Sequence, residues 1–230
     1  KLSRQTKFNM SAKRRSEMWT ALKWAGILSL LYAFITQQVL ANTWIRRVDE
    51  AIKDRKFLFS EKGKTPTLVM LIDDLGLRSI TAIALLITAI IISQRFKSWR
   101  PINLSLLSLL VLNLVVGTSK LLFGRTKPSS GFDLVFTDSG LSYPSGHAAN
   151  ALLTWGMFAY LIFRYSHREP FEGLRLTWFV ISITSGVCLA SLYRNTHWFS
   201  DLLGGLFIGG ALLVLIIALD RKIPSVKQPS

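Results

Sequence analysis

Two histidines of this chain lie in short polar segments that directly precede apolar runs. His147 ends the segment Tyr-Pro-Ser-Gly-His, and His197 precedes Asp201 by four residues. On a helix, residues four apart share one face, so the carboxylate can hold one ring nitrogen of the imidazole. The other nitrogen is then free to act as a nucleophile or a base. This pattern indicates nucleophilic and acid–base chemistry, with a simple helix cap by Asp201 as the alternative.

The segment that contains His147 favours a tight turn, because Pro144 and Gly146 flank Ser145. The start of the helix that follows would present free backbone N–H groups. Together with the Ser145 hydroxyl, these groups suit a phosphate, and His147 can donate a proton to a leaving oxygen. The alternative is that the turn only caps a helix.

A third cluster contains three cations, Lys120, Arg125 and Lys127, with no acid between them. Gly124 and Pro128 complete this segment. A helix that leaves a bilayer with several cations and no nearby acids can hold an anion. The alternative is a set of anchors whose charges extend to the lipid headgroups. Taken together, the three clusters predict a phosphate site.

The elements that must position these clusters are apolar. Half of the 230 residues are hydrophobic, the mean hydropathy is +0.36, and the net charge is +15. A soluble domain rarely combines these properties, whereas a membrane protein with charged loops does. The composition excludes a disordered chain, and the single cysteine excludes a disulfide scaffold. An anionic membrane surface fits the basic charge better than nucleic acid does.

Apolar runs predict an all-α, polytopic membrane protein with six transmembrane helices and an interfacial helix between the first two. The runs are 24–41, 68–93, 102–116, 148–163, 176–192 and 202–219. The second run begins with Asp73, Asp74 and Arg78. We expect this turn at the aqueous boundary, with the acids partly paired to Arg78, unless it forms a functional polar site.

Basic residues in short loops predict the orientation in the plasma membrane. The expected organisation is a cytoplasmic tail over 1–23, one membrane domain over 24–220 and a second cytoplasmic tail over 221–230. The loops 119–147 and 193–201, which contain the three clusters, would then face the extracytoplasmic side.

The clusters resemble the three signatures of the type 2 phosphatidic acid phosphatase (PAP2) family. The matching residues are Lys120-x6-Lys127-Pro128, Pro144-Ser145-Gly146-His147 and His197-x3-Asp201. Lys127 stands where the family has an arginine, and Ser191 stands where the third signature has another. Arg194, one helical turn later, is the nearest arginine that could replace the latter.

The resemblance implies a membrane lipid phosphatase that needs no metal or other cofactor. In this reading His197, oriented by Asp201, attacks phosphorus to form a phosphohistidine, and His147 protonates the leaving group. The residues expected to bind the phosphate are Lys120, Lys127, Ser145, Gly146 and Arg194.

The expected substrate is undecaprenyl or another polyprenyl diphosphate, with phosphatidylglycerol phosphate and phosphatidic acid as alternatives. A lipid-to-lipid phosphotransferase and a non-enzymatic lipid-binding or transport protein also fit the motifs. A vanadium haloperoxidase shares the signatures, but the six predicted spans disfavour it. The sequence predicts no nucleic-acid partner and leaves the oligomeric state open.

Overall fold

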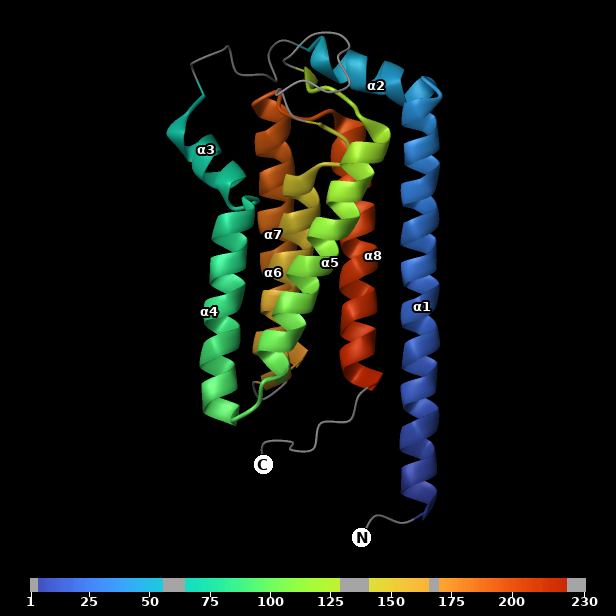
Figure 1. Ribbon diagram of the computed structural model, residues 1–230, viewed down its shortest axis with the longest axis vertical. Helices are drawn as coiled ribbons and strands as arrows, with labels where there is room; N and C mark the ends of the chain where they lie inside the picture. Colours follow the sequence, from blue (N-terminus) through green and yellow to red (C-terminus); the bar gives the residue numbers. More distant parts are fainter. Residues whose placement is uncertain (1–3, 56–64, 129–140, 166–169, 223–230) are drawn as a thin grey trace.

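The computed structural model describes residues 4–55, 65–128, 141–165 and 170–222, which form eight helices and no strand (Figure 1). This confirms the all-α prediction, although the outer parts of the two predicted tails lie outside the described residues. The helices are α1 (Arg4–Leu40), α2 (Trp44–Lys53), α3 (Thr67–Asp74), α4 (Arg78–Phe96), α5 (Arg100–Phe123), α6 (Gly146–Tyr165), α7 (Pro170–Tyr193) and α8 (Phe199–Lys222).

Among the described residues, five helices are long and apolar enough to cross a membrane, namely α1, α4, α5, α7 and α8. These helices make the chain a multi-pass membrane protein. The remaining long helix, α6, lies in the middle of the bundle and packs against α4, α5, α7 and α8. Its buried face includes Leu153, Met157 and Leu161, and it shares one apolar core with Leu85 of α4 and Leu112 of α5.

The prediction of one continuous helix over 68–93 was wrong, because the chain breaks between α3 and α4. At the break, the Leu75 carbonyl accepts a hydrogen bond from Trp155 Nε1 at 2.9 Å. The Gly76 carbonyl accepts one from Asn150 Nδ2, also at 2.9 Å. Side chains of α6 therefore satisfy the carbonyls that the break exposes. Hydropathy could not reveal the break, since the apolar run continues across it.

The first helix also begins earlier than predicted, at Arg4 instead of residue 24. Hydropathy marks the apolar part of a helix and not its end, and lysine and arginine are good helix formers. Near its C-terminal end, α1 packs on α8 and on the loop before α6. Ile35 and Val39 of α1 form a small core there with Ile45 of α2 and Tyr143.

Glycines on α8 allow its backbone to contact the backbone of α6 and of the turn before it. A Cβ atom on Gly205 would lie 2.4 Å from the Ser145 carbonyl oxygen, and one on Gly209 would lie 2.8 Å from the Ala149 carbonyl oxygen. Small residues that let two helices approach closely are a common packing device in membranes. Here they hold the turn before α6 against the start of α8.

We expect Gly209→Ala to lower the thermal unfolding midpoint in detergent, because the added methyl group collides with backbone and overpacking costs about 1–3 kcal/mol. Gly117→Ala on α5 is the matched control, since nothing lies within 4 Å of its Cβ position. Alanine has the higher helix propensity, so this control should leave the midpoint unchanged or raise it. Equal midpoints for the two variants would contradict close α6–α8 packing.

Candidate active site

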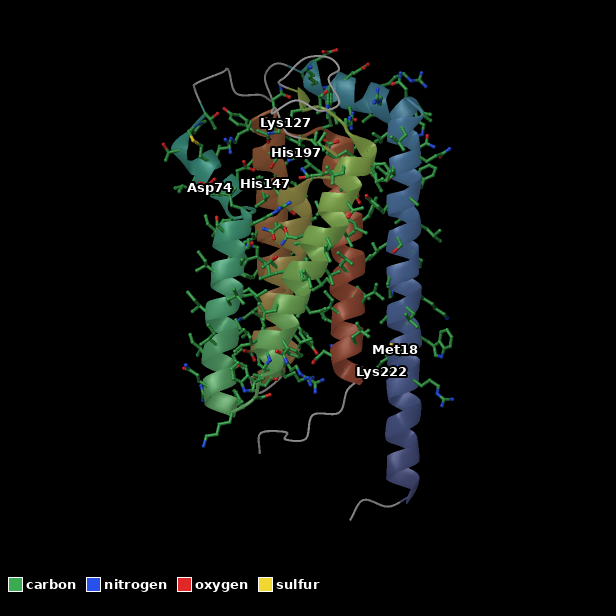
Figure 2. All side chains as sticks on the ribbon, viewed as in Figure 1. Met18, Asp74, Lys127, His147, His197 and Lys222 are labelled. Atoms are coloured by element: carbon green, nitrogen blue, oxygen red, sulfur yellow. The ribbon has the colours of Figure 1, made fainter. Side chains whose placement is uncertain are left out.

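The two predicted catalytic histidines meet at one end of the bundle (Figure 2). His147 lies in the first turn of α6 and His197 lies just before α8, with ring centroids 6.0 Å apart. His197 is buried, and its Nδ1 lies 3.6 Å from Oδ2 of Asp201. This is an ion-pair distance, longer than a hydrogen bond. The structure thus brings together the three residues predicted to be catalytic.

Asp201 is fully buried and lies in the first turn of α8. Its carboxylate accepts hydrogen bonds from the Trp198 backbone N–H at 2.9 Å, from the Ser142 hydroxyl, and from Arg125 Nη1 at 2.9 Å. The bond from the residue before the helix is half of a capping box. Asp201 therefore caps α8 and also lies beside His197, so the two readings of this residue do not exclude each other.

The prediction that the cations near 120–128 have no nearby acid was wrong for Arg125. Its buried guanidinium lies between two carboxylates, with Nη2 2.8 Å from Asp49 Oδ2 and Nη1 2.9 Å from Asp201 Oδ1. Nη1 also donates to the Ser200 hydroxyl at 2.7 Å. Burial raises the pKa of the Asp49 carboxyl, and the Arg125 charge opposes part of that rise. Arg125 is therefore committed to this network and not to a phosphate.

The sequence patterns did not identify Asp49, which lies 76 residues from Arg125 along the chain. Asp49 is one helical turn after Ile45, and both are buried residues of the amphipathic helix α2. An acid on the apolar face of such a helix was the available signal, because an ionised carboxylate on that face needs a buried partner.

Two cations flank the first turn of α6. A Cβ atom on Gly146 would lie 3.8 Å from Lys120 Cε and 3.8 Å from Arg78 Nη2. The charged groups that interact with the Lys120 ammonium include Arg78 and Lys127. Arg78, which we predicted to pair with the acids of its own turn, is thus an additional cation of the site that the motifs did not identify.

The turn before α6 presents an anion-binding helix start. The Ser145 hydroxyl caps the helix by accepting a hydrogen bond from the Ala148 N–H at 3.2 Å. The Ser145 N–H donates to the Asp201 carbonyl at 2.9 Å, which ties the two helix starts together. Within the described ranges, the N–H groups of Gly146 and His147 have no hydrogen-bond partner. These groups can therefore receive phosphate oxygens.

Arg194 enters the same region from the end of α7. Its Nη1 contacts Oδ2 of the buried Asp73, whose Oδ1 accepts a hydrogen bond from the Ser191 hydroxyl at 2.6 Å. Arg194 and Asp73 are both among the charged groups that interact with His147. The partners of Asp73 are thus Arg194 and Ser191 instead of the predicted Arg78, and Arg194 lies within reach of the histidine site.

The structure gathers all the residues that the motifs singled out at one end of the bundle. These residues are His147, His197, Asp201, Lys120, Lys127, Ser145, Gly146 and Arg194. In the part of the chain that is described, no group of three or more His, Cys, Asp or Glu side chains could hold a metal ion.

The sequence model of the PAP2 superfamily matches residues 101–224, more than half of the chain. The chain belongs to this superfamily. The PAP2 match begins in α5 and includes all three signatures, whereas α1 to α4 lie outside it.

Phosphatidylglycerophosphatase B of Bacillus subtilis (strain 168) is 28% identical over 129 residues, which are 52% of this chain and 61% of that relative. A crystal structure of a transmembrane PAP2-type phosphatidylglycerolphosphate phosphatase from Bacillus subtilis matches with a TM-score of 0.77 at 23% identity. That match covers 88% of this chain and 98% of the other. At this identity it shows a shared membrane fold.

We expect Arg125→Leu to destabilise the protein by about 3–5 kcal/mol, because it leaves two buried carboxylates without their partner. The measurement is the thermal unfolding midpoint in detergent. Adding Asp49→Asn should restore part of the loss, since one of the uncompensated charges is then removed. Arg47→Leu, on the exposed side of α2, is the matched control and should change the midpoint little. A double variant no more stable than Arg125→Leu would refute the network.

Proposed function

We propose that this protein is a lipid phosphatase that hydrolyses the phosphate of a membrane lipid through a phosphohistidine intermediate. The observation that carries the proposal is the meeting of His147, His197 and Asp201 beside the start of α6, where Lys120 and Arg78 add positive charge. A histidine beside a carboxylate, a second histidine and an anion-binding surface are the parts that phosphoryl transfer requires.

In the proposed reaction, Nδ1 of His197 faces Asp201, so Nε2 is the nucleophile. Nε2 forms a bond to phosphorus while the bond from phosphorus to the lipid oxygen breaks. His147 supplies the proton to this leaving oxygen. Water then attacks the phosphohistidine, His147 takes a proton from that water, and inorganic phosphate leaves.

The charge that develops on the three equatorial phosphate oxygens needs donors that are already in place. Lys120, Lys127, the Ser145 hydroxyl and the Gly146 N–H are the proposed donors, with Arg78 as an addition to the family pattern. We assign the arginine role of the third signature to Arg194, because it lies beside Asp73 and close enough to interact with His147.

An apolar groove of about 420 Å³ supports a lipid substrate over a soluble one. It is lined by Ile72 of α3 and by Leu189 and Tyr193 of α7, among other residues. Ile72 directly precedes Asp73 and Tyr193 directly precedes Arg194 in the chain, so a lipid tail in the groove would hold its headgroup next to the site.

Phosphatidylglycerophosphate is our first choice of substrate, because the curated relative is named for it. Polyprenyl diphosphate, which the sequence analysis favoured, becomes the second lipid to test. Both are lipids with a terminal phosphate in the headgroup and with apolar tails, and the groove itself does not distinguish them.

We further propose that the protein has six membrane spans, the five listed above and α6. At 20 residues it is about 30 Å long, which matches the hydrocarbon core. The amphipathic helix α2, drawn across the end of the bundle in Figure 1, would lie at the interface. Basic residues in the loops favour cytoplasmic termini and an extracytoplasmic site.

The proposal predicts that the purified protein releases inorganic phosphate from at least one lipid in a panel of phosphatidylglycerophosphate, phosphatidic acid and undecaprenyl diphosphate, with EDTA present. His197→Ala should abolish release and leave no acid-labile phosphoenzyme. His147→Ala should retain more activity on nitrophenyl phosphate than on lipid, because a good leaving group needs no proton. Phosphate that appears only on an added lipid acceptor would identify a phosphotransferase. The absence of reaction with every lipid would contradict the proposal and favour a lipid-binding protein.

Arg194→Ala should lower turnover by on the order of a hundredfold, as for loss of one preorganised donor. Arg194→Lys should recover only part of this, since an ammonium lacks the planar fork of a guanidinium. The measurement is kcat and KM on nitrophenyl phosphate and on the best lipid. Arg47→Ala at the same end of the bundle is the control for lost surface charge. Near-normal turnover of Arg194→Ala on both substrates would show that Arg194 has no part in phosphate binding.

A further inference from the structure

A cavity of about 560 Å³ opens between α1 and α8 at the end of the bundle opposite the histidines. Figure 2 labels Met18 and Lys222 there, far below His147 and His197. Along α8, Asp201 and Arg221 are separated by about 30 Å, from the rise of a helix. The cavity is therefore separate from the candidate active site.

The cavity lies between α1 and α8, towards the C-terminal end of α8 from the point where the two helices contact at Gly210. Leu28 of α1 still contacts α8 at Gly210, where a Cβ atom would lie 3.4 Å from Leu28 Cδ1. Beyond that point, Val214 and Ile217 of α8 line the cavity and do not close it against Trp24 of α1. A gap of this size between two membrane helices requires an apolar occupant.

The rim of the cavity is positively charged, with Arg15, Arg221 and Lys222 against one acid, Glu17. The nearest buried carboxylate, Asp220, does not neutralise this rim because it is already paired. It is bound to Arg100 and Arg164 and accepts a hydrogen bond from the Tyr160 hydroxyl at 2.6 Å.

Two exposed tryptophans, Trp19 and Trp24, also line the cavity, with 60% and 58% of their surface accessible. Tryptophan is enriched at the level of the lipid headgroups. An apolar floor, an aromatic wall and a cationic rim together match an amphiphile with a negative headgroup. Basic pockets between transmembrane helices bind anionic lipid headgroups in this way.

We propose that this cavity is a binding site for an anionic phospholipid of the leaflet opposite the histidine site. Arg15 and Arg221 would bind the phosphodiester, since one guanidinium group can donate two parallel hydrogen bonds to two phosphate oxygens. The acyl chains would lie against Val214, Ile217 and Trp24. The lipid would act as a structural ligand that joins α1 to α8, and the inference does not depend on the proposed catalytic function.

The test uses the full chain in phosphatidylcholine vesicles that contain increasing amounts of phosphatidylglycerol brominated on its acyl chains, which quenches tryptophan fluorescence on contact. The difference between the protein and its Trp24→Phe variant isolates the Trp24 signal from the other tryptophans. We expect this signal to be quenched at a few mole per cent of brominated phosphatidylglycerol, and brominated phosphatidylcholine to need at least tenfold more. Equal quenching by the two lipids would overturn the proposal.

Two variants distinguish the contribution of the lipid headgroup to binding from that of the acyl chains. Combined Arg15→Gln, Arg221→Gln and Lys222→Gln should shift the quenching midpoint at least tenfold towards the phosphatidylcholine value. Val214→Phe fills the cavity and keeps all three cations, so it should also lower quenching. The control is Arg46→Gln with Arg47→Gln at the other end, which should leave the midpoint unchanged. Full quenching in both the triple variant and Val214→Phe would show that lipids only surround this surface.

Discussion

A buried carboxylate, Asp201, must have its charge compensated, and the residues that do this hold the site together. An ionised group inside a helical bundle is stable only when it is paired and hydrogen-bonded. Arg125 supplies the charge, and Ser142 and the Trp198 N–H supply hydrogen bonds. Through Asp49, the same arginine fixes α2 over the end of the bundle. The position of His197 beside Asp201 therefore depends on elements from four parts of the chain.

The cations of the site come from different helices. Two of its charged groups, Asp73 and Arg78, lie on either side of the break between α3 and α4. The break allows Asp73 to contact Arg194 and turns Arg78 towards the start of α6. The signatures of the PAP2 superfamily lack two arginines in this chain. Arg194, Arg78 and Lys127 all lie near the two histidines, whereas Arg125 pairs with the buried carboxylates of Asp49 and Asp201. Positive charge at this end of the bundle thus comes from several elements.

Within a bilayer, helices gain no hydrophobic free energy when apolar side chains move from lipid to another helix. Close packing and hydrogen-bonded polar groups must therefore stabilise the helix bundle. At the site end, Gly205 and Gly209 allow backbone contact between α8 and α6. At the other end, Asp220 joins α8 to α5 and α6 through Arg100 and Arg164. Among the described residues Asp220 has no such contact with α1, and the cavity opens there between α1 and α8.

The helical class, the membrane character, the family and the residue types of the candidate site could be predicted from the sequence. These follow from hydropathy and from spacings of a few residues, such as the four between His197 and Asp201, which local geometry fixes. The sequence did not determine the break at 75–77, the partners of Asp73 or the role of Arg125. Those depend on contacts between residues 74 to 121 positions apart, as between Asn150 and Gly76 or Arg194 and Asp73. Such pairs cannot be predicted from local sequence, because a buried charge is stabilised by the group that helix packing places beside it, however distant in the chain.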